Sequence, residues 1–225
     1  MSDRTAHGAI DDVLRAALKI DWTDAGAAYR ISGGIFDALE GGGDLLATRI
    51  REVIARRGAG GDCESYEQMD KLVLWQSEDR SLRLRLHVFH PGFFDRPHNH
   101  RWSFVSRILT GGYLHSLYGS EETVAEQARA GHAPLSRFVR QETPGTQYFL
   151  EHSLVHSLSA DRVSVSLLLR GPSVKDDYFT WSAAAGRLVQ SRGAAQENTA
   201  DRAAKTMPDA RFDQVLDVLV REGIV

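Results

Sequence analysis

The sequence predicts an all-β core, a small antiparallel β-barrel or sandwich with helices packed at both ends of the chain. Short strand-like segments follow one another from residue 71 to 191, separated by turn signals rich in Gly and Pro. Helical patterns fall before and after this stretch. A chain of 225 residues suits one domain, which at this size can bury a core without disulfide bonds.

The first sixty residues are expected to be helical. In the stretch DLLATRIREVIARRG, apolar side chains recur on one face of a helix. Asp44 is placed to cap the start of this helix, and Gly58 is placed to end it. The side chains predicted to share the buried face are Leu46, Ile50, Val53 and Ile54.

Strand patterns begin with KLVLWQ and SLRLRLHVF. In the second segment leucines alternate with Arg83, Arg85 and His87, so one face buries aliphatic side chains and the other carries polar ones. The polar face lies either in solvent or along a polar cavity, and we expect solvent for at least one of the two arginines. Further strands are expected at WSFVSRIL, YLHSLYG, TQYFL, VSVSLLLRG and RLVQS.

The C-terminal region is expected to hold an exposed connector, GAAQENTADRAAK, and then a final helix, PDARFDQVLDVLVREG. Pro208 suits the first turn of that helix and Gly223 suits its end. We therefore predict a single domain over residues 1–225. Its three parts are a helical N-terminal region (1–66), the barrel (67–193), and the connector with the C-terminal helix (194–225).

Composition excludes several classes of function. The net charge of −3 provides no basic field that would bind nucleic acid. Cys63 is the single cysteine, so no internal disulfide can form, and it is given no role. No signal peptide and no apolar stretch of about 20 residues is present, so we expect a cytoplasmic protein with no membrane partner.

The stretch RPHNHRWSF contains the strongest functional signal. His98 and His100 are two residues apart, and side chains two apart on a strand project to the same side. Two adjacent neutral imidazoles can chelate iron, zinc, copper or nickel. An isolated His-x-His pair is more often an exposed pair without function, so the surrounding sequence must decide between such a pair and a metal site.

The surrounding sequence resembles the first motif of the cupin family, in which Gly, His-x-His and a second Gly recur at these separations. Here the glycines are Gly92 and Gly111. The resemblance implies a double-stranded β-helix (jelly roll) and a third histidine ligand from a later strand. Of two candidates, His156 fits better than His152, because it lies in a strand that is followed by a short turn and another strand.

Within cupins, the segments PHNHRWSFVSRILTGGY, QYFLEHSLVHSL and SVSLLLRGPS resemble cysteine dioxygenase and other three-histidine thiol dioxygenases, over about Lys71 to Gly193. Several family residues are missing. Phe104 and Val105 stand where many cupins have a glutamate ligand, and Val105 also replaces the cysteine that many thiol dioxygenases cross-link to a tyrosine. Arg170 stands in place of that tyrosine, and Leu168 in place of the relay histidine. The substrate or the chemistry is therefore expected to differ.

Other residues are candidates for substrate binding. Arg170 shares a strand face with Ser166 and Leu168 and is expected to point inward, toward either a substrate anion or a protein carboxylate such as Asp95 or Glu151. The remaining candidates follow from their strand faces. Arg83, Arg85 and Trp102 are predicted to bind substrate, and Tyr113 and His115 are predicted to be catalytic.

The resulting hypothesis is a mononuclear non-haem Fe(II) oxygenase with His98, His100 and His156 as ligands. Its substrate would be a small polar anion, with a thiol as one option, and O₂ would be the second substrate. A non-redox metal enzyme (isomerase, decarboxylase or hydrolase) and a small-molecule-binding cupin without activity are the alternatives. Another divalent metal is an alternative to iron, and a homodimer is an alternative to a monomer.

Overall fold

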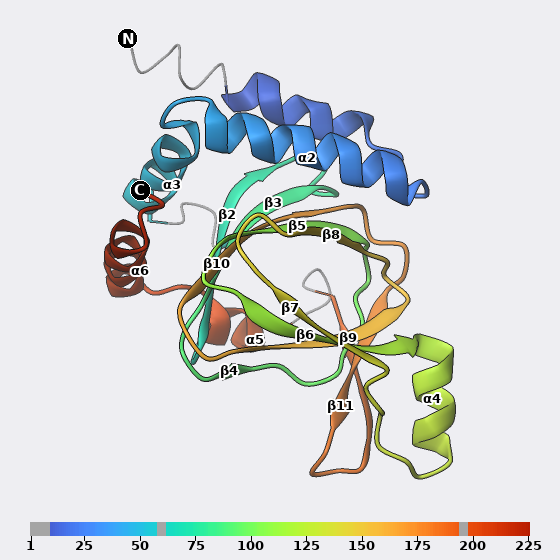
Figure 1. Cartoon of the computed structure of the whole chain (residues 1–225). Coiled ribbons are helices and arrows are strands. Elements are labelled where there is room, and N and C mark those ends of the chain that lie inside the picture. The colour runs from blue at the N-terminus through green and yellow to red at the C-terminus, as the bar shows by residue number, and fades with distance from the viewer. Residues whose placement is uncertain (1–9, 58–61, 194–197) are drawn as a thin grey trace.

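The computed structural model describes residues 10–57, 62–193 and 198–225. Within them, two antiparallel sheets form a barrel that helices flank (Figure 1), which confirms the predicted all-β core. The larger sheet has the order β1 (Glu64–Tyr66), β2 (Met69–Gln76), β3 (Arg83–Phe89), β10 (Ser164–Arg170), β5 (Phe104–Thr110) and β8 (Gln147–Leu150).

The smaller sheet closes the barrel from the other side. Its strand order is β4 (Phe93–Phe94), β9 (Leu154–Ala160), β6 (Tyr113–Ser120) and β7 (Phe138–Glu142). A separate hairpin joins β11 (Asp177–Ser182) to β12 (Arg187–Arg192). The expected strands are present. β1, β4, β7 and β11 are additional strands that the sequence patterns did not indicate, and β1 lies in the region expected to be helical.

The N-terminal helices lie over the outside of the larger sheet. Residues 10–15 are helical and continue into a 3-10 turn (Ala16–Lys19), followed by α2 (Ala25–Gly41) and α3 (Leu45–Ala55). Asp24 caps α2 by accepting a hydrogen bond from the backbone N–H of Ala27, whereas Asp44 makes no side-chain cap, contrary to the prediction. Gly58 lies outside the described residues.

The main apolar core lies between these helices and the larger sheet. Leu72, Leu84 and Leu167 point outward from their strands and pack with α2 residues such as Phe36. Since the aliphatic face of β3 is used here, its polar face turns into the barrel. The expectation that at least one of Arg83 and Arg85 faces solvent is therefore wrong, because both line the interior cavity. The one-domain division stays a prediction.

Helices also occur where none was expected. One of them, α4 (Glu121–Arg129), lies between β6 and β7 and is capped by Ser120. The strands of the barrel therefore do not follow one another without an intervening helix. The expected connector contains α5 (Thr199–Lys205), capped by Asn198, and α6 (Asp209–Arg221) follows as predicted. No helix in the described ranges has the length and apolar character needed to cross a membrane.

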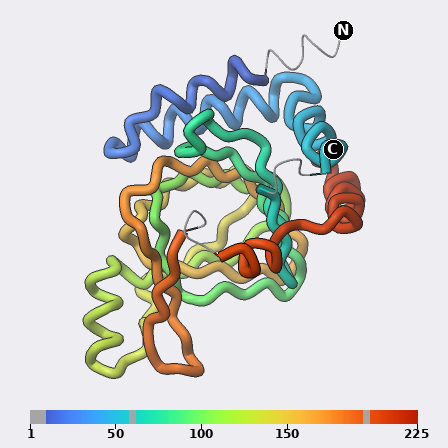
Figure 2. Tube along the Cα trace, turned by 180° about the vertical axis from the view of Figure 1, so that it is seen from behind, coloured from blue at the N-terminus to red at the C-terminus, as the bar shows by residue number. Residues whose placement is uncertain are grey.

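The C-terminal helix α6 lies beside α3 (Figure 2). A buried ion pair attaches α6 to the sheet. Asp70 on β2 is fully buried and accepts hydrogen bonds from Nε and Nη2 of Arg211, at 3.0 and 2.8 Å. His90 Nε2 lies 2.6 Å from the same carboxylate. An exposed pair, Arg57 with Asp213, joins α3 to α6 as well.

We predict that Asp70→Asn lowers the free energy of unfolding by about 1–3 kcal/mol, because a buried charge-assisted contact is lost. Urea unfolding measures the change. The matched control is Asp213→Asn on α6, whose ion pair is exposed and is expected to contribute less than about 1 kcal/mol. Equal effects of the two substitutions would show that the buried pair has no special role in docking α6.

Candidate metal centre

The two histidines of the His-x-His motif lie in the segment between β4 and β5. This segment is not a regular strand, contrary to the expectation, and Pro97 within it has no backbone N–H to donate to a ladder. It is fixed instead by two bridges. In the first, the backbone N–H groups of His98 and His156 each donate to the other's carbonyl at 2.9 Å. In the second, His98 pairs with Thr180 of β11, where the N–H of Trp181 donates to the carbonyl of Pro97 at 2.8 Å. The first bridge places the segments of His98 and His156 at one point of the barrel wall.

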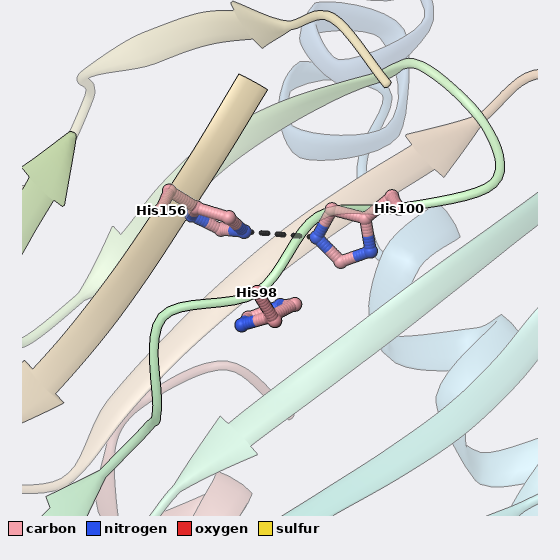
Figure 3. Close-up of side chains that lie close together, drawn as sticks. All are labelled: His98, His100 and His156. Carbon is pink, nitrogen blue, oxygen red and sulfur yellow. Dashed lines mark hydrogen bonds between the residues drawn. The ribbon is translucent and has the colours of Figure 1, made fainter. Parts of the chain in front are cut away.

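The three predicted ligands come together there. His98, His100 and His156 offer nitrogen atoms that all lie within 4.8 Å of one another, and Figure 3 shows the three rings converging. Nε2 of His100 and Nε2 of His156 are 2.8 Å apart. Imidazole nitrogens that share one ion at about 2.0–2.1 Å lie roughly 3 Å apart, so the cluster could hold a metal.

His152 does not belong to this cluster. It lies in the turn before β9, where its Nδ1 is 3.4 Å from Oγ of Ser103. The preference for His156 over His152 as the third histidine therefore agrees with the geometry.

Burial keeps the histidines in the form that binds metals. Desolvation, followed by the charge of His98, lowers the pKa of both His100 and His156 well below the usual value, so their rings are neutral. Nδ1 of His98 donates to the carbonyl of Arg96 at 2.9 Å and lies 3.3 Å from Asp95, so Nε2 is the ring nitrogen left for a metal. Three imidazole ligands suit iron or zinc and leave coordination positions open.

A chain of hydrogen bonds fixes the ring of His156 from behind. Glu142 is fully buried and accepts from Nδ1 of His115 at 3.0 Å, and Nε2 of His115 lies 3.0 Å from Nδ1 of His156. When Nε2 of His115 accepts, His156 donates through Nδ1 and presents Nε2 to the cluster. Although burial raises the pKa of Glu142, hydrogen bonds from His115 and Arg140 lower it below the usual value.

His115 thus lies behind His156 and is absent from the cavity lining, which differs from the catalytic role expected for it from the sequence. Its contacts make it a positioning residue. Tyr113 does line the cavity, and its hydroxyl is 2.9 Å from that of Tyr148. Burial raises the pKa of both phenols, so they remain protonated. The catalytic role of Tyr113 stays a prediction.

Aromatic rings form the wall next to the cluster. The indole of Trp102 stacks on the ring of His100 at a centroid distance of 4.7 Å and an interplanar angle of 27°. Phe104 meets the same imidazole edge-on at 5.2 Å. Apolar rings at these positions limit the access of water to the cluster.

The cluster opens into a cavity of about 880 Å³. The histidines lie on the side of the smaller sheet, and Arg83, Arg85 and Arg170 project from β3 and β10 of the larger sheet into the same cavity. Arg170 is paired with neither Asp95 nor Glu151. Its guanidinium donates to the backbone carbonyls of Arg80, Ser81 and Gly171.

Sequence reasoning missed some contributors to the site. Glu142 lies in β7, a strand that no pattern indicated, and no sequence signal links it to His115. Arg202 and Lys205 of α5 line the cavity although their segment was expected to be an exposed connector. His87 also lines the cavity, and the alternation of β3 does predict its direction.

Comparison with known proteins finds solved structures of low similarity to this chain. No family model and no curated protein matches the sequence. Among solved structures, KdgF from Halomonas sp. is 18% identical with a TM-score of 0.38, covering 49% of this chain and 87% of that chain. An RmlC-like cupin from Shewanella frigidimarina NCIMB 400 is 16% identical (TM-score 0.39; 52% and 89% covered). Ectoine synthase from P. lautus is 13% identical (0.40; 53% and 75%). Similarities of this size support no statement about the substrate or the metal of this protein.

We predict about one metal ion per chain, with nitrogen–metal distances of roughly 2.0–2.2 Å. Elemental analysis should show near-complete loss of metal from His98→Ala and from His156→Ala, because each removes one of three ligands. His152→Ala is the control and should keep its metal. Loss of metal from His152→Ala with retention in His156→Ala would reverse the choice of third ligand.

We also predict that Glu142→Gln weakens metal binding by roughly 10- to 100-fold, because the orientation of His115, and through it of His156, is less firmly fixed. Competition with a chelator measures the affinity. Glu151→Gln, an exposed carboxylate close to the site in sequence, is the control and should leave the affinity unchanged. If Glu142→Gln and the wild type bound the metal with the same affinity, His115 would have no role in positioning His156.

Proposed function

We propose that this protein is a mononuclear non-haem Fe(II) oxygenase acting on a small polar anionic molecule. The observation that carries the proposal is the cluster of three imidazoles that opens into a cavity lined by arginines on the opposite side. A bound Fe(II) would supply open coordination positions at which substrate and O₂ meet.

A thiol is the substrate group that fits best with the sequence resemblance. Addition of both oxygen atoms to sulfur, RSH + O₂ → RSO₂H, balances without any external reductant. The protein residues bind and orient the substrate. Arg170, Arg83 and Arg85 would attract its anionic group, and Trp102 and Phe104 would exclude water around the reacting end.

The donor set also supports a second candidate, a non-redox enzyme. Three histidines are the ligand set of some catalytic zinc sites, in which the ion polarises a carbonyl or activates water. Turnover without O₂ by zinc-loaded protein would favour this alternative. Ligand binding with no turnover under any condition would favour a binding protein without activity.

The test is O₂ uptake by protein reconstituted with Fe(II), using small thiols that carry an anionic group. We expect uptake that matches product one to one in wild type and in His152→Ala, and background uptake in His98→Ala. Arg170→Ala should bind the active substrate about one to two powers of ten more weakly, because a charge-assisted contact typically contributes about 1.5–3 kcal/mol. Full turnover in the absence of O₂ would contradict the oxygenase assignment.

A further inference from the structure

Three arginines are adjacent on the inner face of the larger sheet. Arg83 and Arg85 are two residues apart on β3, and Arg83 lies directly opposite Arg170 in the register of β3 with β10. All three line the cavity that holds the histidine cluster. Like charges at opposite positions of a ladder are destabilising, so this arrangement lowers the stability of the fold when no anion is bound.

Buried polar atoms without partners are concentrated on the same wall. Within the described residues, eight buried side-chain polar atoms have no hydrogen-bond partner, and four of these line the cavity from β3 and β10. They are Nε of Arg83, Arg85 and Arg170 and Nε2 of His87. Buried polar atoms in proteins are nearly always hydrogen-bonded, so four unpartnered atoms in one wall favour a polar ligand as their partner.

The charges of this wall are not balanced by protein carboxylates. Arg83 lies 3.5 Å from Asp62, which is shared with Arg80 at the same distance. Among the described residues, Arg85 has no hydrogen bond or ion pair, and Arg170 bonds only to backbone carbonyls. Burial, and then the charges of Arg85 and Arg83, lower the pKa of Arg170 to about 9. Two guanidinium groups therefore have no hydrogen bond or ion pair to a carboxylate. The charge of Glu64 acts on Arg85, but that carboxylate also pairs with Lys71 and Lys205, each at 3.5 Å.

We propose that Arg83, Arg85 and Arg170 form a binding site for a dianionic oxyanion of the phosphate monoester type. One bidentate arginine satisfies a single carboxylate, which carries one charge and two oxygens. A phosphate monoester carries up to two charges and three terminal oxygens, which matches two unbalanced guanidiniums and several unused N–H groups. Nε2 of His87 is available for a further hydrogen bond to the ligand.

Trp102 connects this site to the metal centre. Its indole stacks on His100, and the guanidinium carbons of Arg85 and Arg170 lie 5.9 and 5.6 Å from its ring centroid. A substrate with its dianionic end at the arginines therefore has its body along Trp102 and its other end at the histidines. This orientation rests on the proposed function, whereas the anion site itself does not depend on turnover.

The experiment measures binding of inorganic phosphate at pH 8 by calorimetry and by the shift in Tm, with chloride holding ionic strength constant. We expect saturable binding and a raised Tm with phosphate, and no comparable shift with acetate. Arg85→Gln is the informative variant, because its guanidinium has the fewest protein contacts. It should weaken phosphate binding by about tenfold to a hundredfold, as expected for a lost charge-assisted contact.

Two comparisons distinguish a ligand-binding role of Arg85 from a purely structural one. Arg187→Gln on β12 removes an exposed charge outside the cavity and should leave phosphate binding unchanged. Without phosphate, Arg85→Gln should be at least as stable as wild type, since a like-charge repulsion is removed. A merely structural Arg85 would instead lower Tm equally with and without phosphate, which would overturn the proposal.

The His98→Ala variant distinguishes the anion site from the metal. Phosphate binding that persists in this variant supports a site on the arginines even if the oxygenase assignment fails. Phosphate binding that disappears in His98→Ala but persists in Arg85→Gln would place the anion on the metal and overturn the proposal. Tighter binding of malonate than of phosphate would assign the wall to dicarboxylates and reject the phosphate type.

Discussion

The pair of backbone hydrogen bonds between His98 and His156 is the constraint on which the candidate centre depends. His98 and His100 belong to an irregular segment, so no strand ladder fixes their direction. The bridge joins that segment to β9, a second bridge joins His98 to Thr180 of β11, and all three imidazoles come within reach of one ion. The Glu142–His115 chain then sets the ring of His156. Backbone pairing thus positions the histidines, and buried polar contacts orient the ring of His156.

The two faces of the larger sheet differ in chemistry. Aliphatic side chains of β2, β3 and β10 pack outward under the helices, and the cations of β3 and β10 therefore face the interior. Burying arginines without carboxylate partners lowers stability. The helical cover and the outward-facing core contribute the apolar burial that offsets this cost. The outward face of these strands thus contributes apolar burial, and the inward face carries the cations that line the cavity.

Much of the fold and the histidine cluster could be predicted from the sequence. Alternation in β3 predicts two faces, and the spacing of His98 and His100, with a later His156, predicts the cluster. Alternation does not say which face meets the core, because that depends on helices far away in sequence. The role of His115 depends on Glu142 in an adjacent strand that short-range patterns do not reveal. Such pairings are set by tertiary register and not by local preference.

The helix α5 has a practical consequence for any work with shortened forms of the protein. Arg202 and Lys205 contribute to the rim of a cavity whose other walls come from residues 62–193, and Met207 is tied to Cys63 by a backbone hydrogen bond. A chain cut before residue 199 would lose these two cations together with α6, whose Phe212, Val215 and Leu219 belong to the main core. Any change in the behaviour of such a shortened form would therefore combine an altered cavity entrance with a weakened core.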